Sequence, residues 1–211
     1  MAVSFDLFGT LVDVSSPENP AAAVAAELET CGVAVPADWD DAYREVHIDA
    51  PDGAEVPLPA HVSAALASRG VDAPNNAPRH AVVAAFDPEV TTRPGAREAV
   101  DAAAAHGPVG LLSNCSVPEL VARTLVRADV GRDDFDTVTT SVACGWRKPH
   151  PDAFATVAGA LGVAVEELIH VGDDPETDGG VADCGGTFVD VADVPPTAFP
   201  EWLATREGRC P

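Results

Sequence analysis

The chain has 211 residues, which is enough for one full hydrophobic core together with a smaller inserted unit. It carries 34 Asp and Glu residues against 12 Lys and Arg, and the resulting formal charge of −22 argues strongly against nucleic acid or an anionic membrane as a partner. The hydrophobic fraction of 46% and the even spread of the acidic residues indicate a folded globular protein.

The dispersed acid, the abundant Ala and Val and the near absence of lysine resemble proteins from extremely salty cytoplasm, where salt screens self-repulsion. The cysteines are odd in number and form no CxxC pair, so we expect reduced, mostly buried thiols and neither a zinc site nor a full disulfide framework; they are Cys31, Cys115, Cys144, Cys184 and Cys210. The N-terminus has no basic region followed by an apolar stretch, and no apolar run has the length of a membrane span. We therefore expect a soluble cytoplasmic protein.

A short apolar strand opens the chain at residues 3–8 and breaks at Gly9-Thr10. Asp6 is thus expected at or near the C-terminal edge of a buried strand. In open α/β sheets this edge is where ligands bind. A lone Asp there is more often a turn or cap residue, so its importance depends on whether other segments place matching groups beside it.

Residues 13–92 have a different character, rich in Ala, Pro and acid. The pattern predicts helices around residues 20–31, 39–47, 60–69 and 79–86, and shows no strong strand. We expect a small, mainly α-helical unit inserted after the first strand. The remaining residues, 1–12 and 93–211, would then form one α/β core.

An alternation of strands and helices resumes after residue 93. Strands are predicted at residues 109–112, 137–141, 168–171 and 187–191, with helices at 96–105, 118–128 and 151–161. Strands that alternate with helices of this length indicate a parallel, doubly wound sheet.

Polar groups follow two of these strands. Ser113 and Asn114 end one strand, where a hydroxyl or backbone N–H groups can hold an anion, whereas Ser116 has the pattern of a helix N-cap. Lys148 follows the next strand and is the only lysine in the protein. Its loop is stiffened by prolines on both sides of His150, which favours an inward-pointing charge for a phosphate or a carboxylate over a surface lysine.

A third segment, Gly172-Asp173-Asp174, delivers adjacent carboxylates at a strand end, and Asp178 follows five positions after Asp173. Clustered carboxylates repel one another unless they share a cation, and an all-oxygen ligand set suits Mg²⁺. A solvated acidic turn is the alternative, and it is the stronger one for Asp174 and Glu176.

Together, Asp6-x-x-Gly9-Thr10, Ser113-Asn114, Lys148-Pro149 and Gly172-Asp173-x-x-x-x-Asp178 resemble the four ordered motifs of the haloacid dehalogenase superfamily. The spacing resembles the subgroup with a helical cap between the first and second motifs. This resemblance implies a flavodoxin-like sheet with a mobile lid and a nucleophilic Asp.

Carried over by position, the resemblance assigns a role to each motif residue. Asp6 would form an aspartyl-phosphate, Ser113 would bind phosphoryl oxygens and Lys148 would balance charge. Substrate contacts would come from Gly9, Thr10 and Asn114. Mg²⁺ would be held by Asp6, the backbone carbonyl of Phe8, Asp173 and Asp178.

Phe8 departs from the family pattern, because phosphatases of this family usually have a second Asp there as general acid and base. Three interpretations stay open. The first is a Mg²⁺-dependent phosphatase of a small phosphorylated metabolite, with leaving-group protonation unnecessary or supplied from elsewhere, for example by His47 or His61. The second is a 2-haloacid dehalogenase that forms an ester at Asp6, with Arg44 as the nearest candidate for a halide cradle. The third is a weakly catalytic or non-catalytic phosphate-binding protein. The oligomeric state, monomer or dimer, stays open.

Overall fold

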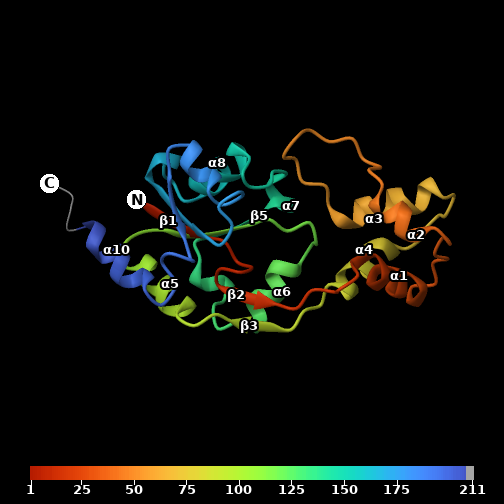
Figure 1. Ribbon diagram of the computed structural model, residues 1–211, viewed down its shortest axis with the longest axis horizontal. Helices are drawn as coiled ribbons and strands as arrows, with labels where there is room; N and C mark the ends of the chain where they lie inside the picture. Colours follow the sequence, from red (N-terminus) through yellow and green to blue (C-terminus); the bar gives the residue numbers. More distant parts are fainter. Residues whose placement is uncertain (208–211) are drawn as a thin grey trace.

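The computed structural model describes residues 1–207 of the chain (Figure 1). Its centre is a five-stranded sheet in which every neighbouring pair of strands is parallel. The strand order is β5 (Thr137–Thr140), β4 (Val109–Ser113), β1 (Ala2–Phe5), β6 (Leu168–Gly172) and β7 (Thr187–Asp190). The predicted α/β class with a doubly wound parallel sheet is confirmed.

Helices cover both faces of this sheet. One face packs against α5 (Ala96–Ala104), α6 (Leu120–Arg127) and α10 (Phe199–Glu207), and the other against α8 (Pro151–Ala160) and α9 (Gly180–Asp183). Because both faces are buried, the central strands need apolar residues at successive positions rather than at alternate ones. All residues of β1, β4 and β6 are buried accordingly.

The sheet reverses its winding between β1 and β6. The chain runs from β1 outward to β4 and β5, and then crosses back to β6 and β7 on the other side of β1. Loops that leave the carboxyl ends of β1 and β6 therefore diverge and open a crevice between them. Asp6 directly follows β1 and its backbone N–H donates to Val171 of β6, with an N–O distance of 2.8 Å.

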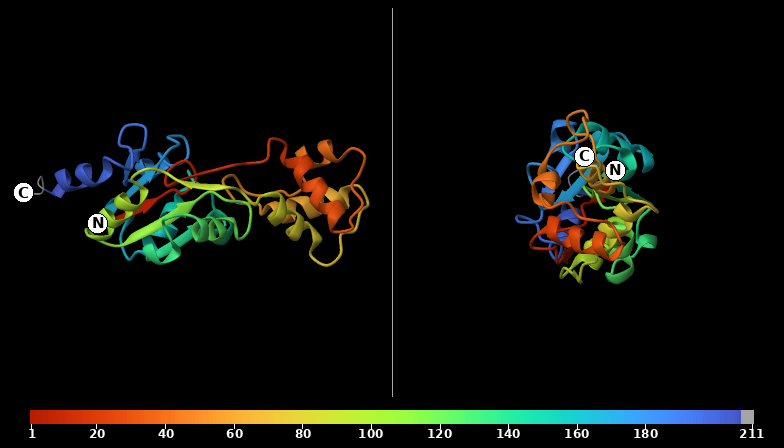
Figure 2. Two further views of the ribbon diagram at one scale, coloured as in Figure 1. Left: turned by 90° about the horizontal axis from the view of Figure 1, so that it is seen from below. Right: turned by 90° about the vertical axis from the view of Figure 1, so that its right-hand side faces the viewer.

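Four helices form a separate bundle beyond the carboxyl end of the sheet (Figures 1 and 2). They are α1 (Pro20–Thr30), α2 (Trp39–Arg44), α3 (Leu58–Ser68) and α4 (Ala77–Ala85), and we call them the helical unit. The molecule is elongated, with the core and the helical unit at opposite ends (Figure 2). The helical unit has its own buried side chains, among them Leu28, Trp39 and Leu66.

The sequence analysis predicts no strand within residues 13–92, and this prediction is wrong. β2 (Val12–Val14) and β3 (Val90–Thr92) pair antiparallel and connect the core to the helical unit. Each has only three residues, too few to show an alternating pattern in the sequence.

Other boundaries differ by smaller amounts. Ser141, expected as the last residue of a strand, instead begins the short helix α7 (Ser141–Cys144), where the Thr140 side chain accepts from the Ala143 N–H. The helix expected to reach residue 47 ends at Arg44, because Glu45 is extended and pairs with Arg69 at the end of α3. The C-terminal helix α10 was not expected.

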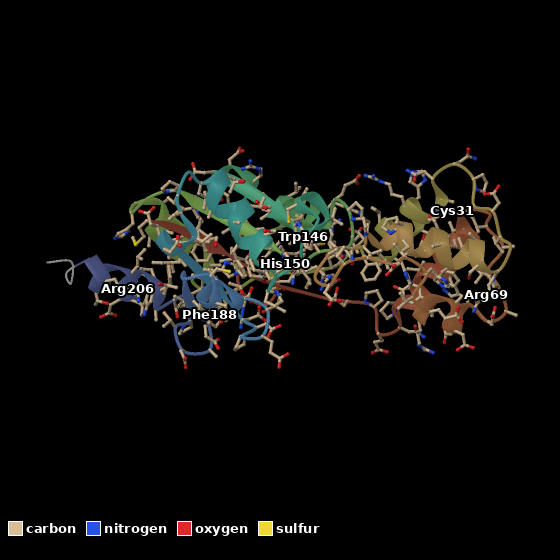
Figure 3. All side chains as sticks on the ribbon, turned by 90° about the horizontal axis from the view of Figure 1, so that it is seen from above. Cys31, Arg69, Trp146, His150, Phe188 and Arg206 are labelled. Atoms are coloured by element: carbon tan, nitrogen blue, oxygen red, sulfur yellow. The ribbon has the colours of Figure 1, made fainter. Side chains whose placement is uncertain are left out.

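The thiols are less buried than the sequence analysis predicts. Cys115 is buried, Cys144 and Cys184 are half-buried, and Cys31 is exposed on the helical unit (Figure 3). Cys210 lies outside the described residues. No helix within residues 1–207 combines the length and apolar character that crossing a membrane requires.

Candidate active site

Asp6 and Lys148 form the centre of the site. The Lys148 ammonium lies 2.6 Å from Asp6 Oδ1, 2.6 Å from Asp178 Oδ1 and 2.9 Å from the backbone carbonyl oxygen of Leu112. Its side chain is 1% exposed, so the three N–H groups are spent on buried acceptors. The single lysine of the chain therefore points inward, as its proline-bounded loop predicts.

Asn114 fixes the backbone of that loop. Its side-chain amide donates to the Lys148 carbonyl over 2.9 Å and its side-chain oxygen accepts from the Lys148 N–H over 2.8 Å. Two reciprocal hydrogen bonds leave the loop little freedom to rotate, so Asn114 at the end of β4 holds Lys148 at the end of the neighbouring loop.

Gly9 and Thr10 bring Asp173 against the loop that follows Asp6. The Thr10 hydroxyl donates to Asp173 Oδ1 over 3.2 Å. Gly9 has φ +83°, and a Cβ there would lie 2.3 Å from Asp173 Oδ2. Any side chain at position 9 would push the carboxylate away, which explains why the chain needs glycine at this point. Both residues thus act on Asp173 in this conformation.

Asp178 is positioned by a hydrogen-bonded chain of two buried polar residues, His170 and Ser4, which the sequence analysis did not select. His170 Nε2 lies 3.0 Å from Asp178 Oδ1, and His170 Nδ1 lies 2.8 Å from the Ser4 hydroxyl. Because a carboxylate only accepts, Nε2 carries the proton, and Nδ1 then accepts from Ser4. A polar residue within an otherwise apolar buried strand is the sequence signal for such partners.

The ionisation of the three central groups is linked. Burial raises the pKa of Asp6 to about 6, against the opposing effect of Lys148. Burial acts to lower the pKa of Lys148, but Asp6 and Asp178 outweigh it and raise the pKa. Burial likewise opposes the charge of Asp178, yet the hydrogen bond from His170 and the charge of Lys148 lower its pKa. Lys148 and Asp178 are therefore charged at neutral pH, and burial lowers the pKa of His170 and keeps it neutral.

Asp174 makes its hydrogen bonds within the turn that follows Asp173. Its carboxylate accepts from the Glu176 N–H at 2.9 Å and from the Thr177 hydroxyl at 3.0 Å. Its backbone carbonyl accepts from the Asp178 N–H at 2.8 Å. These bonds give Asp174 a local structural role, in agreement with the acidic-turn interpretation.

Asp6, Asp173 and Asp178 together fit a divalent cation. One carboxylate oxygen from each lies within 4.8 Å of the others, and this is a hard all-oxygen donor set. Both oxygens of Asp178 already accept, from Lys148, His170 and the Asp174 N–H, so its geometry favours contact with a cation through water. Asp6 and Asp173 have more free acceptor capacity.

These groups open into a cavity of about 250 Å³. Its lining residues are Asp6, Phe8, Asn114, Arg147, Lys148, Asp173, Asp174, Thr177 and Asp178. Gly9, Thr10 and Ser113 are not among them. The buried Ser113 hydroxyl has no hydrogen-bond partner within residues 1–207, a rare state for a buried polar atom.

The other candidates from the helical unit lie elsewhere. The Nε2 atoms of His47 and His61 each lie 2.7 Å from backbone carbonyls of α2, those of Ala42 and Tyr43. Arg44 is exposed on α2 and pairs with Asp40. None of the three lines the cavity in this conformation.

Comparison with known proteins agrees with this fold and motif set. A family model described as haloacid dehalogenase-like hydrolase matches residues 1–199, and the chain therefore belongs to that family. None of the curated proteins matches it. The resemblance drawn from the four motifs is confirmed.

Solved structures described as dehalogenases and solved structures described as phosphatases both share the fold. A 2-haloacid dehalogenase from Pseudomonas syringae pv. tomato is 20% identical with a TM-score of 0.68, covering 97% of this chain and 98% of its own. A predicted phosphoglycolate phosphatase from Haemophilus somnus is 17% identical with a TM-score of 0.56, covering 97% of each chain. CbbY from Rhodobacter sphaeroides, solved with phosphate, is 19% identical with a TM-score of 0.57, covering 89% of this chain and 84% of its own. At these identities the likeness shows the fold alone.

Proposed function

We propose that this hydrolase is a Mg²⁺-dependent phosphatase of small phosphorylated molecules. The observation that carries the proposal is the convergence of Asp6, Asp173 and Asp178. A dehalogenase that needs no metal gives Asp173 no role in its reaction, whereas Asp178 also pairs with Lys148 and would serve either chemistry. A phosphatase needs the metal-binding arrangement, because a cation must offset the repulsion between the Asp6 carboxylate and a phosphate dianion.

In the proposed reaction, an oxygen of Asp6 attacks phosphorus, and the bond from phosphorus to the leaving oxygen breaks. Water then attacks the aspartyl-phosphate, which releases inorganic phosphate and regenerates Asp6. Lys148 keeps Asp6 oriented at 2.6 Å and balances the negative charge. Asp6, Asp173 and the backbone carbonyl of Phe8 would hold Mg²⁺, with Asp178 beside them, and the cation would supply Lewis-acid polarisation of the phosphate.

The unpartnered Ser113 hydroxyl supports an anion at the end of β4. A phosphoryl oxygen would give this buried donor the acceptor that it lacks, and Asn114 would complete that side of the site. Residues 13–92 would act as a cap on a core made of residues 1–12 and 93–211, with the β2–β3 pair as the connection that lets it move.

A second candidate is 2-haloacid dehalogenation, favoured by Phe8, which lines the cavity where a phosphatase of this family has its acid. A halide leaves without a proton, so this chemistry requires no acid at position 8. Non-catalytic phosphate binding is the third candidate, since the motifs alone can bind phosphate.

An activity panel at high salt tests the proposal. Aryl, acyl and alkyl phosphates and 2-haloacids are supplied with Mg²⁺ or with EDTA. The proposal predicts phosphate release that EDTA abolishes. Halide release that EDTA leaves intact would establish the dehalogenase instead, and no turnover of any substrate would favour the binding protein.

A further inference from the structure

Arg147 provides the positive charge that the cavity leaves available for a ligand. Four carboxylates line the cavity, from Asp6, Asp173, Asp174 and Asp178, against two cationic side chains. Lys148 is spent on its buried acceptors. The Arg147 side chain is 45% exposed, so its guanidinium can still meet a ligand in the cavity.

Glu55 positions this guanidinium. Its carboxylate lies 3.0 Å from the Arg147 Nη1 atom, and its side chain is only 2% exposed. The same carboxylate oxygen accepts from the Ser141 hydroxyl, which in turn accepts from the Cys115 N–H over 2.8 Å. Within residues 1–207, the guanidinium's one acceptor is this carboxylate, so most of its five N–H donors stay free.

The backbone beside the pair is equally fixed. Arg147 N–H donates to the Gly53 carbonyl and Glu55 N–H donates to the Gly145 carbonyl, both over 2.9 Å. Gly53 has φ +79°, and a Cβ there would lie 2.9 Å from the ring of His150. Trp146 and His150 stack at the end of the core that faces the helical unit (Figure 3). A segment between α2 and α3 thus sets the position of Arg147.

We propose that Arg147 is a specificity residue that binds a carboxylate of the substrate while the phosphate of the same molecule reacts at Asp6. The substrate class is therefore a short phosphorylated carboxylic acid, an inference that rests on the proposed phosphatase function. A planar guanidinium forks onto a carboxylate through two parallel hydrogen bonds. One cation matches a monoanion better than a second phosphate dianion, and a cavity of about 250 Å³ suits a molecule of few carbons.

Binding of two phosphonates that resist hydrolysis tests this assignment without requiring turnover. Phosphonoacetate carries a carboxylate and methylphosphonate does not, and both are titrated calorimetrically with Mg²⁺ at high salt. The wild type should prefer phosphonoacetate by roughly 10- to 100-fold, the value of a charge-assisted bidentate contact. Arg147→Gln should reduce the preference to about twofold or less. Arg147→Lys, which keeps the charge without the fork, should give an intermediate value.

Two further variants separate position from charge. Glu55→Gln should lower the preference less than Arg147→Gln does, because the guanidinium remains but loses its anchor. Arg97→Gln on α5 removes the same charge from a surface arginine that pairs with Asp101 and Asp134, and should keep the wild-type ratio. If Glu55→Gln does not fold, as judged by thermal unfolding, the Arg147 variants decide alone.

A wild-type ratio near one, or a ratio that Arg147→Gln leaves unchanged, would overturn the inference. Aryl phosphate hydrolysis, measured on the same samples, tests the phosphatase proposal separately. No hydrolysis with an Arg147-dependent ratio would refute the phosphatase and keep the carboxylate site. Hydrolysis together with a binding ratio that does not depend on Arg147 would support the phosphatase and refute the carboxylate site.

Discussion

Phe8 is the residue that most constrains the chemistry. It follows Asp6 by two positions, is half-buried, and lines the cavity, so no proton donor occupies that point. General acid catalysis is worth about 10²–10⁴-fold in rate. The site should therefore cleave esters whose leaving group is stable as an anion far faster than alkyl esters.

Phe8→Asp tests this argument. The variant should raise alkyl phosphate hydrolysis selectively, by up to about 10²-fold, because the new carboxylic acid can protonate the leaving oxygen. The measurement is the ratio of aryl to alkyl kcat/KM in wild type and variant, with folding checked by thermal unfolding. A folded variant with an unchanged ratio would show that the acid comes from elsewhere, such as the helical unit.

Asp6 should exchange a proton when the cation binds. Since burial raises the pKa of Asp6 to about 6, the metal-free carboxyl is about half protonated at that pH and ionised two units above it. Mg²⁺ requires the ionised form, so its binding should release about half a proton near pH 6 and almost none near pH 8. Calorimetry in buffers of different ionisation enthalpy measures this release.

Asp6→Asn supplies the control, because it removes the titrating group and should abolish the release near pH 6. The direction of the pKa shift of Asp6 also determines how the free energy of unfolding changes with pH. The raised pKa of Asp6 favours folding at low pH, and this contribution is lost as pH rises through about 6. Proton release that is independent of pH in the wild type would contradict the assignment.

The meeting of the residues proposed to act directly was predictable, because each follows a strand and parallel strands end at the same edge. Asp6, Lys148 and Asp173 all meet as that rule requires. Ser4 and His170 each stand out as a polar residue in a buried strand, but their pairing was not predictable, since it joins residues 166 positions apart on neighbouring strands. Glu55 was hidden for a similar reason, because one acidic residue among 34 carries no signal until its burial is known.

At the scale of elements, the turn between β6 and α9 gives the adjacent carboxylates of Asp173 and Asp174 different roles. Asp173 faces Gly9 and Thr10, whereas Asp174 is occupied by hydrogen bonds within the turn. Asp173→Asn should therefore weaken Mg²⁺ affinity by about 10-fold or more, since it removes a charged ligand. Asp174→Asn, the matched control, should weaken it several-fold less. Calorimetric titration compares the two, and equal losses would show that the wrong carboxylate was chosen.

Whole elements were predictable where they were long. The sheet strands are recognisable as short apolar runs, and the helices α5 and α6 have clear amphipathic patterns, whereas the two strands of three residues have neither signal. α10 was missed because Pro195, Pro196 and Pro200 indicate a loop at its start. Only its packing of Phe199 and Leu203 into the core reveals it.

At the scale of the molecule, the net charge of −22 acts on an elongated two-part shape (Figure 2). Repulsion among the acidic side chains destabilises the folded state at low salt. Added salt weakens this repulsion, because the Debye screening length falls to about 3 Å at 1 M salt. The midpoint of urea unfolding should therefore rise steeply as KCl increases from 0.1 to 2 M.

A variant that neutralises the exposed residues Glu29, Asp133 and Glu201 as amides is the control for charge, and its salt dependence should be shallower. The same slope in both proteins would attribute the stabilisation to a general salt effect on hydrophobic burial and not to screening.

Beryllofluoride binding tests the central claim, a phosphate that becomes attached to Asp6, most directly. Beryllofluoride mimics a phosphoryl group on a carboxylate oxygen, so with Mg²⁺ the wild type should show bound fluorine resonances by ¹⁹F NMR. Asp6→Asn should fold normally, because the amide is nearly isosteric, yet show no bound signal and no phosphatase turnover. Absence of bound signal from the folded wild type, or its persistence together with full turnover in Asp6→Asn, would contradict the account.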